Sequence, residues 1–216
     1  MNYPLITPHT TFQAVVLCDG DYPTHHVPLS ILNEAKYVCC CDNASLHFIK
    51  KQRRMPQLIV GDGDSLPQMF QQKYADIFKK ISEQDDNDQT KATRICIQQG
   101  AKRIAYLGAT GKREDHTLSN ISLMVRYLRD FCIDVTMITD YGYFIPSKGD
   151  NKFATFKGQQ VSVFNFGSTR IESKGLKWDT YPFTELWQGS LNEALGNEIE
   201  ILADGYYLVY RTFDAK

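Results

Sequence analysis

The chain lacks the features that mark membrane-spanning, secreted and nucleic-acid-binding proteins. No apolar run approaches the roughly 18 residues that cross a bilayer, and the N-terminal residues do not follow the basic-then-apolar pattern of a signal peptide. The formal net charge is −1, so the basic excess expected of a nucleic-acid binder is missing. We expect a cytoplasmic protein with no membrane or nucleic-acid partner. The composition does not exclude a small charged ligand.

The six cysteines contain no C-x-x-C pair, and three of them are adjacent at 39–41. Neighbouring strand residues point to opposite faces of a sheet, so these three cannot easily chelate one metal ion. Each cysteine lies in an apolar segment, where a free thiol behaves as a small buried hydrophobic group. We expect all six to belong to the core, and reducing conditions fit better than secretion.

The first 140 residues alternate short apolar runs with helix-like segments. A chain of 216 residues has room for one large or two small domains. Continuous apolar runs are typical of buried strands in a parallel sheet that is covered on both faces, and the segments between them predict right-handed crossover helices. Strands are predicted at 14–18, 37–41, 57–60, 103–107 and 134–138, and helices at 88–99 and 119–129.

After about residue 140 the pattern changes to short alternating β-branched and aromatic runs, which predict half-buried antiparallel strands. Asp204-Gly205 predicts a hairpin between the last two of them. The predicted fold class is α/β, with a Rossmann-like parallel-sheet domain over 1–141 and a smaller C-terminal antiparallel β-sandwich over 142–216. Strands are predicted at 152–156, 160–164, 169–173, 198–202 and 206–210.

Carboxylates follow the predicted strands of the first domain. Asp62 and Asp64 come directly after the run 57–60, and Asp88 and Lys91 begin the next predicted helix. In parallel sheets ligands collect at the carboxyl ends of the strands, so one rim gathers these groups. Carboxylate oxygens suit Mg²⁺, while Lys91 and Arg113 suit phosphate. The pattern indicates phosphoryl-type chemistry with a magnesium ion at Asp62, Asp64 and Asp88.

These motifs, in this order, resemble the thiamine pyrophosphokinase family. The matching segments are Asp42-Asn43-Ala44, 56–65, Gln84-Asp85-x-x-Asp88-x-x-Lys91, Gly111-Lys112-Arg113-x-Asp115-His116-x-x-x-Asn120, 175–178 and 189–193. The resemblance implies a homodimer, with its active site completed between subunits, that transfers the diphosphate of ATP to the hydroxyl of thiamine and releases AMP. Mg²⁺ is the implied cofactor.

The candidate site residues fall into three groups. The catalytic candidates are Asp62, Asp64, Asp88 and Asp115; by resemblance Asp115 lies near the reacting group and orients or deprotonates the thiamine hydroxyl. The nucleotide candidates are Asp42, Asn43, Gln84, Asp85, Lys91, Gly111 and Arg113. The thiamine candidates, matched through the family, are Trp178, Ser190 and Asn192.

The chain departs from the family pattern at five positions. Asn43, Ala44 and Lys112 stand where the family commonly has glycine, Gly63 where it has an aromatic residue, and Asn87 where it has threonine or a similar residue. Glycine permits a close backbone approach to phosphate, so nucleotide geometry could differ here. None of these departures removes an acid that the mechanism needs.

Other readings of the same residues stay open. Asp86 fits a solvated loop or helix cap, His116 an ordinary hydrogen-bonded histidine, Trp178 a core residue and Asn192 a turn. As a whole, the chain could instead be a Mg-dependent phosphatase with Asp62 as nucleophile, another phosphotransferase, or a noncatalytic thiamine or nucleotide sensor.

Overall fold

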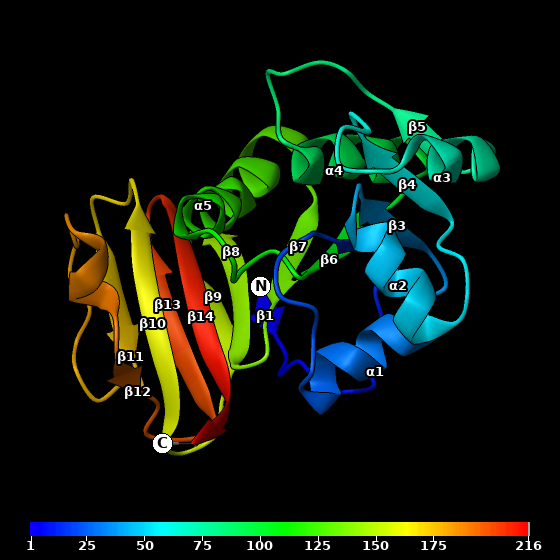
Figure 1. The fold of residues 1–216 in the computed structure, drawn as a ribbon. Helices are drawn as coiled ribbons and strands as arrows, with labels where there is room; N and C mark the ends of the chain where they lie inside the picture. The colour runs from blue at the N-terminus through cyan, green and yellow to red at the C-terminus, as the bar shows by residue number, and fades with distance from the viewer. Residues whose placement is uncertain (216) are drawn as a thin grey trace. The chain divides into compact units, whose positions relative to one another are not determined.

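The structure is a computed structural model that describes residues 1–215 and divides the chain into two compact units. One unit consists of Pro8–Leu123 and Ile133–Asp140. The other consists of Met1–Thr7, Met124–Cys132 and the chain from Tyr141 onward. The predicted mixed α/β fold is confirmed, and each unit is considered separately below (Figure 1).

The unit that begins at Pro8 is built on parallel strands. Every residue of β2 and β3 is buried, because their Val, Leu and Cys side chains pack on both faces of the sheet. This burial explains why continuous apolar runs predicted these strands. The strand order is β7 (Asp134–Ile138), β6 (Arg103–Leu107), β2 (Ala14–Leu17), β3 (Val38–Cys41), β4 (Leu58–Gly61) and β5 (Phe78–Lys80).

Helices follow most of these strands. The predicted helices 88–99 and 119–129 exist as α4 and α5, although α5 is longer than expected. Asn87 caps α4, its side chain accepting a hydrogen bond from the Thr90 N–H at 3.0 Å, and α4 packs against β2, β3 and β4. The bounds are α1 (His26–Glu34), α2 (Ala44–Gln52), α3 (Gln68–Lys73), α4 (Asp88–Gln98) and α5 (Glu114–Phe131).

The other unit contains two small sheets. In one, all neighbouring strands are antiparallel, in the order β12 (Asn192–Glu193), β10 (Gln159–Phe166), β14 (Tyr206–Ala215) and β8 (Gly142–Lys148). In the other, β1 alone is parallel to its neighbour, in the order β1 (Asn2–Tyr3), β9 (Asn151–Ala154), β13 (Glu198–Ala203) and β11 (Ile171–Lys174).

The two sheets of this unit pack through aromatic and charged side chains of β14. The ring of Tyr207 meets that of Phe153 on β9 edge-on, with centroids 6.4 Å apart, and its hydroxyl accepts a hydrogen bond from Asn151 Nδ2 at 2.8 Å. Arg211 is fully buried and donates to the carbonyls of Pro4 and Ala154. Backbone oxygens thus supply partners for the two terminal nitrogens of the buried guanidinium, while its Nε has none.

The hairpin expected at Asp204-Gly205 is wrong, because β13 and β14 belong to different sheets. The Asp204 carboxylate accepts hydrogen bonds from the backbone N–H groups of Thr169 and Arg170, at 2.8 and 3.0 Å. These bonds fix the turn where the chain leaves one sheet and enters the other. A tight Asp-Gly turn therefore links two layers here instead of two neighbouring strands.

Five of the six cysteines are buried as expected, and Cys132 is the exception. Cys132 follows the end of α5 with a φ of 54° and is exposed, so it terminates a helix and does not fill the core.

Within residues 1–215, no helix combines the length and the apolar character needed to span a bilayer.

Candidate active site

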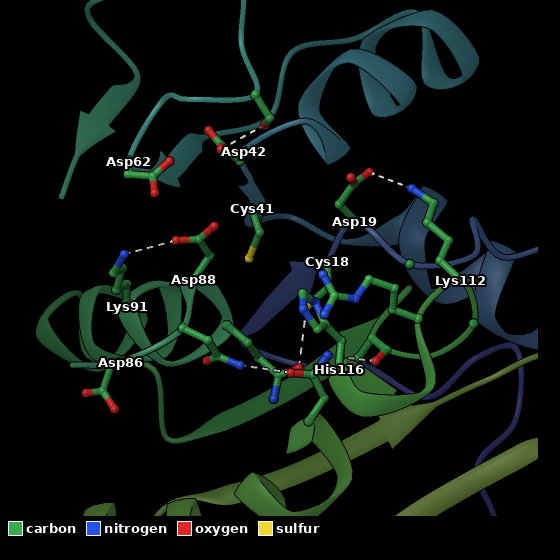
Figure 2. Close-up of a pocket in the computed structure, with 18 of the residues that line it drawn as sticks. Cys18, Asp19, Cys41, Asp42, Asp62, Asp86, Asp88, Lys91, Lys112 and His116 are labelled. Carbon is green, nitrogen blue, oxygen red and sulfur yellow. Dashed lines mark hydrogen bonds and ion pairs between the residues drawn. The ribbon is translucent and has the colours of Figure 1, made fainter. Parts of the chain in front are cut away.

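A cavity of about 490 Å³ opens at the carboxyl ends of β2, β3, β4 and β6. Each of these strands is followed by a lining residue, namely Asp19, Asp42, Asp62 and Ala109 in turn. Figure 2 shows Asp42, Asp62 and Asp88 on one side of Cys41, with Asp19 and Lys112 on the other. The rim expected from the strand pattern is therefore a real concavity.

Asp42 is the most constrained acid of this cavity. It is only 7% exposed, and Oδ2 accepts a hydrogen bond from the Ser65 hydroxyl at 2.8 Å, while Oδ1 is buried without a partner. Burial raises the pKa of Asp42 above its ordinary 3.8, and the charges of Asp88 and Asp62 raise it further against the Ser65 hydrogen bond. A Cβ on Gly61 would lie 2.6 Å from the Asp42 carboxylate, so glycine keeps this space open.

Asp62 has the opposite electrostatic environment. Its Oδ1 accepts a hydrogen bond from the backbone N–H of Asp64 at 3.0 Å. This bond, together with the Gln84 side chain and the nearby Lys91 charge, holds the pKa of Asp62 below its usual value despite some desolvation. Asp62 is therefore ionised at neutral pH and offers negative oxygen to a cation.

Each cation that lines the cavity is held by a carboxylate. Lys91 Nζ lies 3.2 Å from Asp88 Oδ1, and its side chain is only 3% exposed. Arg113 is bidentate on Asp115, with Nε and Nη2 at 3.1 and 2.6 Å from the two oxygens. This guanidinium lowers the pKa of Asp115, which is a poor proton acceptor as a result.

The structure brings together most, but not all, of the nucleotide and metal candidates. Those that line the cavity are Asp42, Asp62, Gln84, Asp88, Lys91, Gly111 and Arg113. Asn43, Asp64, Asp85 and Asp115 are not among its lining residues, and Asp64 and Asp85 are exposed. Asn43 and Asp115 still contact lining residues, through Asp19 and Arg113 respectively.

The three thiamine candidates lie in the other unit. Trp178 is 55% exposed, so it is not a core residue. The buried Asn192 accepts a hydrogen bond from the Trp178 N–H at 3.1 Å and donates one to its carbonyl at 2.7 Å. Asn192 therefore fixes the backbone that carries the indole, and Ser190 bonds the carbonyl of Trp187 at 2.7 Å.

Sequence reasoning missed several lining residues. The sequence predicts a solvated loop or helix cap for Asp86 and an ordinary hydrogen-bonded histidine for His116, yet both residues line the cavity. Asp86 also forms an ion pair with Arg94 at 3.1 Å. The cap of α4 is Asn87 and not Asp86. Asp19 follows a predicted strand directly, and this position predicts that it lies on the rim, but the sequence assigns it no role.

Two thiols also line the cavity, those of Cys18 and Cys41. The Cys18 thiol donates to Gln89 Oε1 at 3.5 Å. A hydrogen bond of the Cys41 thiol with Cys18, followed by burial, raises the pKa of Cys41 well above its ordinary value. The Cys41 thiol is therefore protonated and unreactive at neutral pH.

Among residues 1–215, no three His, Cys, Asp or Glu side chains are close enough to enclose a metal ion. The expected trio of Asp62, Asp64 and Asp88 is therefore not assembled in the protein alone. The donor chemistry still fits a hard cation that keeps several waters, because such an ion needs only one or two protein carboxylates. Asp42 also lines the cavity, and its Oδ1 is buried without a hydrogen-bond partner.

Comparison with known families decides what this cavity belongs to. Residues 29–137 match the family model "Thiamin pyrophosphokinase, catalytic domain", and residues 142–210 match "Thiamin pyrophosphokinase, substrate-binding domain". The chain belongs to the thiamin pyrophosphokinase family. Every residue of the cavity except Cys18, Asp19 and Gly20 falls within the catalytic-domain match.

Individual relatives agree with this assignment. Thiamin pyrophosphokinase 1 of Caenorhabditis elegans is 29% identical over 107 residues, which cover 46% of this chain and 44% of that protein. The chain thus matches less than half the length of that relative.

Solved structures share the fold of this thiamin pyrophosphokinase family member. The enzyme from Candida albicans is 19% identical, with a TM-score of 0.77 and coverage of 98% of this chain and 94% of that one. The structure from Bacillus subtilis is 15% identical, with a TM-score of 0.76 and coverage of 95% and 100%. At these identities the likeness concerns the fold.

Proposed function

We propose that this protein transfers the diphosphate of ATP to the hydroxyl of thiamine, giving thiamine diphosphate and AMP. The observation that carries the proposal is the cavity of the catalytic-domain match, where carboxylates and phosphate-binding cations meet at the carboxyl ends of parallel strands. Diphosphoryl transfer needs such a mixture, because catalysis rests on positioning and on neutralising phosphate charge. The substrate-binding match over 142–210 supports thiamine as the acceptor.

The charge of the cavity supports a divalent cation, proposed to be Mg²⁺. Five carboxylates and three cationic side chains line it, which leaves a formal charge of −2 with His116 neutral. A nucleoside triphosphate adds further negative charge, so it can enter only together with cations. Asp62, Asp64 and Asp88 are the residues proposed to hold the metal, which would neutralise phosphate oxygens and align the leaving group.

The side chains of the cavity have distinct proposed roles toward ATP. Lys91 and Arg113 bind phosphate oxygens, the lysine as a point charge and the arginine through its fork of donors. Asp42 and Asn43 stand where β3 meets α2 and bind the nucleotide through side-chain oxygens and backbone N–H groups. Gln84, Asp85 and Gly111 complete the nucleotide site along the same rim.

Asp115 is proposed to orient the thiamine hydroxyl for in-line attack. Its bidentate contact with Arg113 and its lowered pKa favour orientation over proton abstraction. The same contact couples the nucleophile's position to the phosphates, because Arg113 can bind both partners. Holding the thiamine hydroxyl in line with the phosphate raises the rate of transfer through proximity and orientation, so no strong base is required.

Thiamine is cationic and flat, so an exposed indole offers it a suitable wall. Trp178 is proposed as that wall, with Ser190 and Asn192 beside it. The same part of the chain exposes further large apolar groups, including Trp187 at 72% and Leu191 at 75%. This surface supports the proposal that the enzyme is a homodimer whose active site is completed between subunits.

The finer fold description also belongs to the proposal. We take 1–141 as a Rossmann-like catalytic domain and 142–216 as a β-sandwich for thiamine binding and dimerisation, in a cytoplasmic enzyme.

Incubation with ATP, Mg²⁺ and thiamine tests the activity, with AMP and thiamine diphosphate as the expected products. Thiamine monophosphate with ADP would indicate single phosphoryl transfer, and free phosphate would indicate a phosphatase.

A further inference from the structure

Three loops of the cavity are joined through one carboxylate, that of Asp19. Lys112 Nζ lies 3.1 Å from Asp19 Oδ1, and Asn43 Nδ2 lies 3.4 Å from both oxygens. The three residues follow β2, β6 and β3, which are neighbouring strands of the parallel sheet. Figure 2 shows the Lys112 side chain reaching toward Asp19 at the cavity. The proposed function so far assigns no role to Asp19 or Lys112.

The backbone at Lys112 is held in an unusual conformation. Lys112 has a φ of 56° and follows Gly111 at 81°, so a residue with a long side chain occupies the left-handed region that favours glycine. Such strain persists where the surroundings impose it, and it clusters at ligand-binding sites. Here the turn directs an ammonium group toward the cavity.

The contact between Lys112 and Asp19 is easily exchanged. The two side chains are 48% and 37% exposed, and Lys112 reaches only one carboxylate oxygen. Ion pairs of this exposure are weak. The Arg113–Asp115 pair is more exposed still, at 70% and 61%, but it is bidentate, and Lys91 is almost fully buried. Lys112 is therefore the lining cation that an incoming polyphosphate releases most readily.

We propose that Lys112 is a ligand for the triphosphate of the nucleotide, held on Asp19 until the nucleotide arrives. Asp19 then acts as a positioning residue that competes with phosphate for the ammonium group, while Asn43 keeps the carboxylate in place. The inference rests on the proposed function, because it assumes a nucleoside triphosphate in this cavity. It adds two residues that set the affinity for that substrate.

Opposite effects on affinity distinguish this role from a structural one. We would measure the binding of an ATP analogue with a methylene bridge between the α- and β-phosphates by calorimetry, at fixed Mg²⁺ concentration. Lys112→Met should weaken binding about fivefold to tenfold, and Lys112→Arg should restore most of it. Asp19→Asn should strengthen binding several-fold, because the competitor is gone. AMP, which lacks the outer phosphates, should bind all four proteins within about twofold.

Two control variants separate competition from general charge. Asp86→Asn also removes one lining carboxylate, but Asp86 pairs with Arg94. Lys152→Met removes a similarly exposed, ion-paired lysine that does not line the cavity. In the Lys112→Met background, Asp19→Asn should gain no more affinity than Asp86→Asn does. Thermal melting of each variant shows that it is folded.

Several outcomes would overturn the inference. Equal binding by the wild type and Lys112→Met removes the phosphate contact, and weaker binding by Asp19→Asn removes the competition. If Asp19→Asn raises the affinity for the ATP analogue equally in the wild-type and Lys112→Met backgrounds, the effect is one of general charge and not of competition for Lys112. If the folded wild type binds no triphosphate analogue at all, the proposed function fails, and this inference fails with it.

Discussion

Asp42→Asn should make the protein more stable at neutral pH while it weakens the binding of Mg²⁺ and nucleotide. The substitution keeps the shape of the side chain, and asparagine tolerates the Asp42 φ of 42°. Its amide oxygen can still accept the Ser65 hydrogen bond. What disappears is a buried negative charge whose second oxygen has no partner and which Asp88 and Asp62 repel.

The sign of this effect follows from the raised pKa of Asp42. The folded protein binds the proton of Asp42 more tightly than the unfolded chain does, so this group contributes stability below its ordinary pKa of 3.8 and loses it as pH rises. We expect Asp42→Asn to have a higher free energy of unfolding than the wild type at pH 7.5, and for a chain of this size each gain of about 1 kcal/mol raises Tm by about 2–4 °C.

Thermal melts at pH 7.5 and pH 4 check this reasoning. The gain of Asp42→Asn over the wild type should be largest at pH 7.5 and should shrink toward pH 4. Saturating Mg²⁺ with a nonhydrolysable ATP analogue should reverse the order, because ligand binding stabilises only the form that binds it. An unchanged or lower Tm for Asp42→Asn at pH 7.5 would refute the idea that this carboxylate is held at a cost.

Three further predictions concern other groups of the chain. Lys91→Met should cost about 1–2 kcal/mol, because Asp88 loses its ion-pair partner, and denaturant unfolding measures this loss. Asp115→Asn should lower kcat by about tenfold or more while the Kd for ATP stays within about twofold, as rapid-quench and binding assays would show. In native protein one thiol, that of Cys132, should react rapidly with an aromatic disulfide reagent; fast labelling of Cys41 would contradict its raised pKa.

The strands were predictable where their burial is unambiguous. β6 and β7 have the limits expected from the sequence, because a strand buried on both faces reads as a continuous apolar run. β5 (Phe78–Lys80) was missed because it is short and ends in two exposed lysines. The Asp204-Gly205 hairpin failed because a local turn signal does not reveal that the next strand joins another sheet.

The sequence predicts that the site lies at the carboxyl ends of the parallel strands, but it does not predict the contacts between the side chains there. Asp42 and Asp62 line the cavity because the carboxyl ends of parallel strands meet at one edge. Asp64 was grouped with Asp62, yet Gly63 turns the chain at a φ of 80° and the Asp64 side chain is exposed. The link between Asp19 and Lys112 joins residues 93 positions apart, so no local pattern could predict it.

The most direct test of the proposed activity follows one phosphate. Purified protein is incubated with Mg²⁺, thiamine and ATP labelled at the β-phosphate, and the products are separated by chromatography. Transfer of an intact diphosphate predicts label in thiamine diphosphate, with unlabelled AMP formed in equal amount. Label that remains in ADP, or that appears as inorganic phosphate without thiamine diphosphate, would contradict the proposal.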